Sequence, residues 1–317
     1  VNVYGNVPYF EKTVRDDDPD TMYKDRDDRQ YVMDKVYDMC RFVLDNMRLD
    51  DGANTLNRYI AAGFISRMML NEGTWQYYHA QQYEDFCDDE HAKKYLEMAV
   101  EAGDLVIKSG KYSFGSDFKS LFASNDLAGN PEILMYRHYD AGLSITHCVG
   151  SYTGGSESQT GVNLEFIKAF NCNDGQPMLL SKAADPNDPS ELSLAKLAVS
   201  RDPRFFDTFY NRVSKHSSSM IYSNKFAARE ALDYYFENNQ KHPDWNGMYN
   251  TNDAPIMRLG EVALNWIEAK AVLAEMGIGN VTQEDIDLSI NGIRNRPLNA
   301  DAIAAGVKKT TALSLSA

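Results

Sequence analysis

The sequence has 317 residues, of which 43% are hydrophobic, enough to build one large globular domain or two smaller ones. Its 46 acidic residues outnumber its 32 basic residues and give a net charge of −14. A surface of this charge repels phosphate groups, which argues against nucleic-acid binding and against electrostatic attachment to anionic lipid.

Residues 1–28 contain few apolar residues in any regular spacing and read as irregular chain. They include an acidic run, Asp16, Asp17, Asp18 and Asp20, whose carboxylates could bind calcium. The run lacks the spaced ligands and the glycine of an EF-hand loop, so a solvated acidic loop is favoured. We expect no cofactor, with a structural calcium ion as the open alternative.

Three segments then show the apolar spacing of helices, separated by short polar breaks. The first helix is predicted from Asp28 to about Arg48. A second is predicted to begin after Asn54 or Thr55 and to end between Asn71 and Gly73, and a third covers residues 89–108. Short breaks between helices indicate antiparallel neighbours, as in helix-hairpin repeats.

The periodicity weakens between Lys111 and Tyr249. This stretch offers a short strand candidate at residues 132–137, a Gly/Ser-rich loop at residues 151–161 and a short helix at residues 164–170. A long connection inside a compact protein is usually functional or carries small structure of its own.

The longest apolar stripe in the chain lies in residues 254–277. Pro255 suits the first turn of a helix, and Gly277 suits a left-handed stop after its last turn. Residues 282–285 then resemble a capping box that begins a last helix, which stops before Pro297. The Ala-rich tail that follows has no evident partner.

Motifs for catalysis are missing from the sequence. It has no GxSxG elbow, no Walker loop and no dinucleotide fingerprint, and its six His form no HExxH pattern. Its four Cys are too widely spaced for a zinc ribbon or a CxxC redox motif. We therefore expect a protein that is not an enzyme and holds no metal centre.

Aromatic clusters are the remaining candidates for a site. Sugar rings stack their C–H faces on aromatic side chains while their hydroxyls bond to polar groups, and loops commonly carry such recognition. A place in the core or as a loop plug is the alternative for each residue. The candidate ligand-binding residues are Trp75, Tyr77, Tyr78, Tyr139 and Tyr152.

Four passages, in order along residues 4–296, resemble the SusD/RagB family of outer-membrane nutrient-binding lipoproteins. The first is Tyr4-Gly5-Asn6-Val7-Pro8-Tyr9, similar to a YGDVP entry. The second joins KKYLEMAVEAGDLVIKSGKYSF, at residues 93–114, with the strand candidate near Glu132. The third is LEFIKAFNCNDGQP with the later RDPRFF, and the last is PIMRLGEVALNWIEA with NGIRNR.

The resemblance implies a mainly α fold, built from tetratricopeptide-like helix hairpins with an irregular, loop-rich ligand-binding subdomain. We expect one SusD-like domain over residues 1–317, with a helical scaffold in residues 28–110 and 254–296 and a loop-rich insertion in residues 111–253. The family's lipidated Cys, its first helices and its terminal Arg- and Trp-rich stretch have no counterpart in this sequence. The resemblance therefore leads us to expect part of a longer chain.

The function that the resemblance implies is capture of oligosaccharides, or sometimes peptides, at the outer surface of the cell outer membrane. The ligand would pass, chemically unaltered, to a TonB-dependent, SusC-like β-barrel transporter, and an N-terminal lipid would be the only membrane attachment. The alternative is a helical-repeat scaffold that holds a protein partner on a concave surface. Copurification of a large β-barrel is expected under the first hypothesis, and of another partner under the second. An unrecognised hydrolase ranks below both, because no nucleophile with its base is visible.

Overall fold

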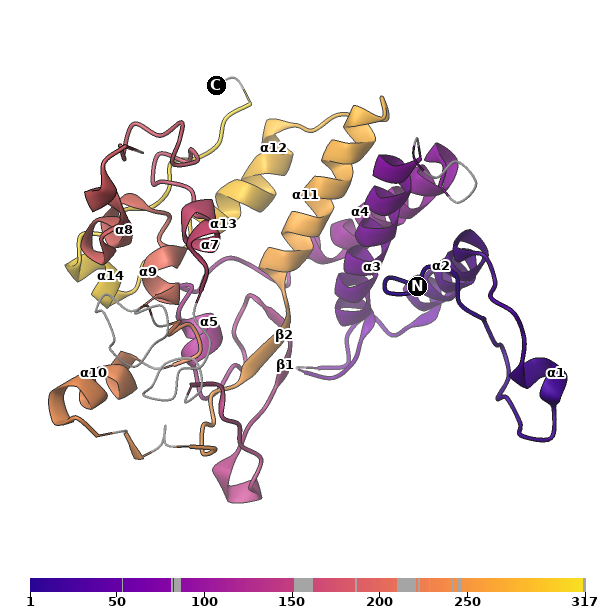
Figure 1. Ribbon diagram of the computed structural model, residues 1–317, viewed down its shortest axis with the longest axis horizontal. Helices are drawn as coiled ribbons and strands as arrows, with labels where there is room; N and C mark the ends of the chain where they lie inside the picture. Colours follow the sequence, from indigo (N-terminus) through magenta and orange to yellow (C-terminus); the bar gives the residue numbers. More distant parts are fainter. Residues whose placement is uncertain are drawn as a thin grey trace. The chain divides into compact units, whose positions relative to one another are not determined.

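The computed structural model describes residues 1–52, 54–80, 82, 87–150, 162–185, 187–209, 221, 223–227, 229–240, 242–243 and 247–315. The chain divides into two compact units, Val1–Gly110 with Glu261–Val281, and Lys111–Gly260 with Thr282–Ala317. Within the described residues the elements are mostly helices, with one two-stranded antiparallel sheet, which confirms the prediction of a mainly α fold (Figure 1). The predicted grouping into a single domain stays a prediction.

The described helices range in length from 3 to 22 residues. They are α1 (Pro19–Met22), α2 (Arg29–Asn46), α3 (Arg58–His79), α4 (Asp89–Ile107), α5 (Ser120–Ala123), α7 (Leu164–Ala169), α8 (Leu194–Ser200), α9 (Arg204–Thr208), α10 (Arg229–Asn238), α11 (Leu259–Glu275), α12 (Gln283–Ile286), α13 (Gly292–Arg294) and α14 (Ala300–Ala304). The strands are β1 (Ile133–Arg137) and β2 (Ala254–Arg258), and shorter turns are η1 (Ala141–Leu143), η2 (Pro189–Leu192) and the π-helical η4 (Asp287–Asn291).

The first unit is built on helices α2, α3 and α4 and on α11 from Glu261 onward. Helices α2 and α3 run antiparallel, because the start of α2 bonds to Glu72 near the end of α3 while Arg58, at the start of α3, reaches the carbonyl of Met47. Helices α3 and α4 also run antiparallel, since Gly73 lies against Leu96 and Gln76 against the N-terminal cap of α4. These are the antiparallel neighbours that the short breaks predicted.

The predicted end of α3 near Gly73 is wrong, because the helix continues to His79. Its start is also later than expected, since Asn57 caps it by accepting a hydrogen bond from the N–H of Ile60 at 3.1 Å. Gly73 does not stop the helix but allows a close approach, because a Cβ there would lie 2.6 Å from Leu96 Cγ. A glycine next to polar residues can either end a helix or let another helix approach, and the sequence does not distinguish the two. In α3 the close approach of α4 accounts for Gly73.

A second close approach joins α4 to α11. A Cβ on Gly103 would lie 2.7 Å from Cβ of Trp266, whose indole is fully buried and donates to the Asp104 carboxylate at 2.9 Å. The predicted apolar stripe of this helix is buried from Leu259 to Leu273, and Gly277 has the predicted left-handed φ of 79°. The backbone of α4 at Gly103 therefore touches the Trp266 side chain of α11 so closely that a methyl group does not fit between them.

The helix predicted from residue 254 is wrong in its first turn, because residues 254–258 form strand β2. This strand pairs antiparallel with β1, Pro255 lying opposite Tyr136. A strand in a two-stranded sheet has one open edge, so proline is tolerated there as it is in the first turn of a helix. The sequence therefore did not distinguish an edge strand from the first turn of a helix at Pro255. The strand predicted at residues 132–137 is confirmed as β1.

The second unit is held by a buried ion pair and by aromatic packing. Glu132, fully buried directly before β1, accepts from Arg296 Nε at 2.8 Å, and Arg258 Nη1 lies 3.4 Å from the same carboxylate. Phe170, directly after α7, packs edge to face on Phe205 of α9, with ring centroids 5.4 Å apart. The predicted short helix at residues 164–170 is confirmed as α7, and the predicted capping box at Thr282 is present.

The tail after Pro297 is packed, although the sequence suggested no partner for it. Helix α14 places Ala302 in a buried cluster with Phe206 and Val307, and Thr310 donates to the Asp202 carboxylate at 2.7 Å. The partners lie about 100 residues earlier in the chain, beyond the reach of local patterns.

Across the described residues, none of the helices combines the length and the apolar character needed to cross a bilayer.

We predict that Gly103→Ala destabilises the protein by about 1–3 kcal/mol, because the new methyl group overpacks the contact with Trp266. Without that contact, alanine in a helix interior would instead stabilise by roughly 1 kcal/mol. Urea unfolding measures the difference.

Gly115→Ala is the matched control, since the same methyl group would lie 3.6 Å from its nearest neighbours. It should change the free energy of unfolding by no more than about 0.5 kcal/mol. If the Gly103→Ala protein is as stable as the wild type, the contact between α4 and Trp266 has room for a methyl group and is less tightly packed than described.

Candidate functional site

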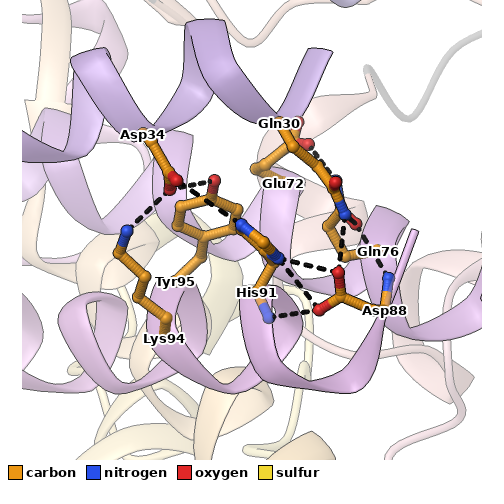
Figure 2. A network of polar contacts seen from close by, with 8 residues as sticks. All are labelled: Gln30, Asp34, Glu72, Gln76, Asp88, His91, Lys94 and Tyr95. Carbon is orange, nitrogen blue, oxygen red and sulfur yellow. Dashed lines mark hydrogen bonds and ion pairs between the residues drawn. The ribbon is translucent and has the colours of Figure 1, made fainter. Parts of the chain in front are cut away.

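A connected set of polar side chains joins helices α2, α3 and α4 (Figure 2). Gln30 of α2 donates to the Asp88 carboxylate at 2.8 Å, and the amide oxygen of Gln76 accepts from the backbone N–H of Asp88 at 3.2 Å. His91 Nδ1 lies 2.8 Å from Asp88, and its Nε2 lies 3.4 Å from Asp34. The set spans three helices, so it fixes their register as well as their separation.

Asp34 carries the other end of this network. It accepts from Lys94 Nζ at 2.6 Å and from the Tyr95 hydroxyl at 2.9 Å. Burial by itself raises the pKa of Asp34, but these hydrogen bonds outweigh it and hold that pKa below its ordinary value. The stabilisation is therefore present at neutral pH and is lost as the pH falls through the lowered pKa.

A buried ion pair lies beside the network. Arg29 is 5% exposed and Glu72 is 1% exposed, and the two form a bidentate pair with distances of 2.8 and 2.6 Å. Gln76 donates to the same carboxylate at 2.9 Å. The guanidinium of Arg29 also lies over the indole of Trp75, 3.6 Å from its ring centroid, and Trp75 stacks on His79 at 4.8 Å. Packing and charge thus hold the indole in one orientation.

A cavity of about 640 Å³ opens beside this pair, and we call it the Trp75 pocket. Rings and guanidinium groups form much of its wall. Tyr4 is 73% exposed at its rim, and Asp25 and Arg26 are exposed beside it. The described lining residues are Tyr4, Gly5, Asn6, Asp25, Arg26, Arg29, Trp75 and His79. Ring faces with hydrogen-bonding groups beside them are the features by which proteins hold sugars.

The five predicted site residues do not lie together on one loop cluster. Trp75, Tyr77 and Tyr78 lie on the last turns of α3 rather than on a loop, and of these Trp75 lines the pocket. Tyr78 is 58% exposed, and its hydroxyl lies 3.4 Å from the Glu275 carboxylate. Burial and the charge of Glu275 raise the pKa of Tyr77 and of Tyr78, so both phenols are neutral.

Tyr139 belongs to the second unit, where its ring meets His147 edge to face at 4.5 Å. Its backbone N–H donates to Asp253, a fully buried carboxylate that also accepts from His138 and from the N–H of Leu127. The contacts hold Tyr139 at the end of the β1–β2 pair. Tyr152 lies outside the described residues, and the roles of all five residues as ligand contacts stay predictions.

A second cavity, of about 480 Å³, lies in the second unit, and we call it the Lys225 pocket. Its walls combine phenylalanine rings with three cationic side chains. The described lining residues are Phe118, Val162, Phe166, Ala169, Phe170, Asn171, Asp202, Arg204, Thr208, Phe209, Ser223, Lys225 and Arg258. Sequence reasoning did not find this pocket, because its residues come from segments more than 100 positions apart.

In the acidic run at residues 16–20, the carboxylates of Asp17 and Asp18 bond to neighbouring residues. Asp17 pairs with Arg15 at 2.8 Å, and Asp18 caps α1 through the N–H and hydroxyl of Thr21. Within the described chain, no three His, Cys, Asp or Glu side chains gather as metal ligands would. A structural calcium ion in this run stays a prediction.

A profile of the SusD family matches residues 131–309. The chain is also similar to the crystal structure of a SusD-like carbohydrate-binding protein from Bacteroides fragilis NCTC 9343, with a TM-score of 0.66 and 16% identity over 98% of this chain. It is similar to surface glycan-binding protein A from Bacteroides uniformis, with a TM-score of 0.50 and 13% identity over 98% of this chain. The chain spans 56% of the length of each. A search of curated proteins gives no significant match.

We predict that Glu72→Gln costs about 3–5 kcal/mol of stability, because it leaves the charge of Arg29 buried without its partner. The substitution should also free the indole of Trp75 from its fixed orientation. In a urea titration, tryptophan fluorescence should therefore change at lower urea concentrations than the main unfolding transition.

Glu101→Gln is the control, because Glu101 pairs with Arg41 at 2.6 Å on the surface, where 54% of its side chain is exposed. That surface pair should contribute no more than about 1 kcal/mol to the free energy of unfolding. Equal losses in the two variants would contradict a special role for the buried pair.

Proposed function

Because the chain belongs to the SusD family, as its four motifs predicted, we propose that it captures glycans at the cell surface and does not alter them chemically. The described fold is similar to that of a SusD-like carbohydrate-binding protein and to that of a surface glycan-binding protein. We further propose that a lipid holds the protein at the outer face of the outer membrane and that a SusC-like, TonB-dependent transporter receives the ligand. A β-barrel that copurifies from outer membranes would support this partner.

The Trp75 pocket is the observation that carries the proposal. Tyr4 offers an exposed ring, while the indole of Trp75 is fixed by Arg29 and His79 and needs no ordering when a ligand arrives. Pre-organised rings lower the entropy cost of binding, and stacking on them tolerates different sugars. The carboxylate of Asp25 and the guanidinium of Arg26 lie beside the rings as partners for hydroxyl groups.

Two of the four thiols are not activated for nucleophilic attack. Burial raises the pKa of Cys40 to about 11 and also raises the pKa of Cys87. Both thiols are therefore protonated at neutral pH, and a protonated thiol is a poor nucleophile. In the proposed role, the protein binds its ligand and releases it intact.

We predict that Tyr4→Ala weakens oligosaccharide binding about 5- to 10-fold, the loss expected when one stacking ring is removed. Isothermal titration against a panel of neutral and acidic oligosaccharides measures it, and the ligand should be recovered unchanged.

The matched control is Tyr23→Ala, because Tyr23 is 81% exposed at the end of α1 and does not line the pocket. Its affinity should equal that of the wild type. Wild-type protein that binds no glycan, or one that releases shortened sugar, would overturn the proposed function.

A further inference from the structure

The Lys225 pocket has cationic groups in a protein of net charge −14. Lys225 is half-buried, and within the described chain its amine contacts ring faces, 4.1 Å from the centroid of Phe122 and 5.4 Å from that of Phe118. Cation–π contacts replace only part of the hydration that a buried ammonium loses. The amine thus has donors left for a ligand.

Among the described residues, no carboxylate pairs with this amine. Asp202 is taken by Arg204, at 2.6 Å, and by the hydroxyl of Thr310. Glu132 is shared between Arg296 and Arg258, the latter at 3.4 Å. The charged residues among the described lining residues are Asp202, Arg204, Lys225 and Arg258, and the charges of Arg204 and Arg258 repel that of Lys225.

The electrostatic state of Lys225 follows from these neighbours. Burial, and then the charges of Arg258 and Arg204, lower the pKa of its amine to about 8. Because the unfolded amine titrates near 10.5, the protonated form costs stability at neutral pH, and this cost is relieved as the pH rises above 8. A folded protein that keeps a destabilising cation in a cavity often uses it for function.

The other wall of the pocket is apolar and ring-lined. Phe166 of α7 and Phe170, which follows the helix, both meet Phe209 edge to face, with centroids 6.3 and 5.9 Å from that of Phe209. The three residues line the same cavity as Lys225. The ligand that fits is therefore a ring with an anionic substituent, the ring lying against phenylalanine and the anion against the cations.

We propose that the Lys225 pocket binds the anionic group of an acidic sugar, a pyranose that carries a carboxylate or a sulfate. This inference rests on the proposed glycan capture and adds the class of glycan. An incoming anion would contact Lys225 and offset its repulsion by Arg204 and Arg258, and it would raise the pKa of the amine on binding.

The test is isothermal titration of the whole chain at pH 7 with three tetrasaccharides. They are tetragalacturonic acid, its fully methyl-esterified form and a sulfated galactan tetramer without carboxylates. The acid tetramer should bind about tenfold more tightly than its ester, because a charge-assisted hydrogen bond is lost with the negative charge. The sulfated tetramer then distinguishes a carboxylate site from a general anion site.

Two variants assign the preference to Lys225. Lys225→Met should remove the advantage of the acid over the ester and should raise Tm at pH 7, since it removes the desolvated cation. Lys225→Arg should keep the advantage, because guanidinium stays charged. Raising the pH from 7 to 9.5 should weaken acid binding in the wild type but not in Lys225→Arg. Lys270→Met, which removes a cation over the ring of Trp266 and lines neither pocket, should change none of this.

The inference is overturned if the acid and its ester bind equally well, or if Lys225→Met retains the preference for the acid. Neutral glycan binding with no preference for the acid would leave the proposed function standing and remove the inference. If no glycan binds at all, the proposed function fails, and glucuronate titrated into wild type and Lys225→Met decides whether the pocket binds anions.

Discussion

The bidentate pair between Arg29 and Glu72 is the contact on which the first unit depends. Removing two charges from water is costly, and the pair is tolerated because Gln76 and the indole of Trp75 complete its surroundings. The same contacts place α2 against α3 and hold Trp75 in one orientation at the edge of a cavity. A structural role and the proposed binding role therefore rest on the same few side chains, and a change in one should affect the other.

Local patterns predicted the four longest described helices, though not all of their ends, together with α7, the start of the last helix and one strand, whereas shorter helices such as α8, α9 and α10 were not predicted. Capping residues and apolar spacing located α2 and α4, and the Thr282 capping box was predicted by its spacing alone. The errors have a common cause, because Gly73 and Pro255 fit two environments equally well. Gly73 allows α4 to approach, and Pro255 lies in a strand paired with residues about 120 positions earlier, so tertiary contacts decided both.

The candidate site was harder to predict than the fold. Sequence reasoning selected aromatic residues expected on loops, yet Trp75, Tyr77 and Tyr78 lie on a helix, and Trp75 is the one of these three among the described lining residues of the Trp75 pocket. Arg29 and Tyr4 were not selected, although Tyr4 lies in the motif that resembles the family. Lys225 had no sequence signal at all, because its significance comes from Arg204 and Arg258, which other segments bring near it. Pockets of this kind are properties of the folded chain.

Hydrogen–deuterium exchange of the protein, with and without a bound oligosaccharide, tests the central claim most directly. The account predicts that ligand slows amide exchange in segments 4–6, 25–29 and 75–79, which contain the residues that line the Trp75 pocket and lie far apart in the sequence. Slower exchange confined to other segments, with these three unchanged, would contradict glycan capture at this pocket.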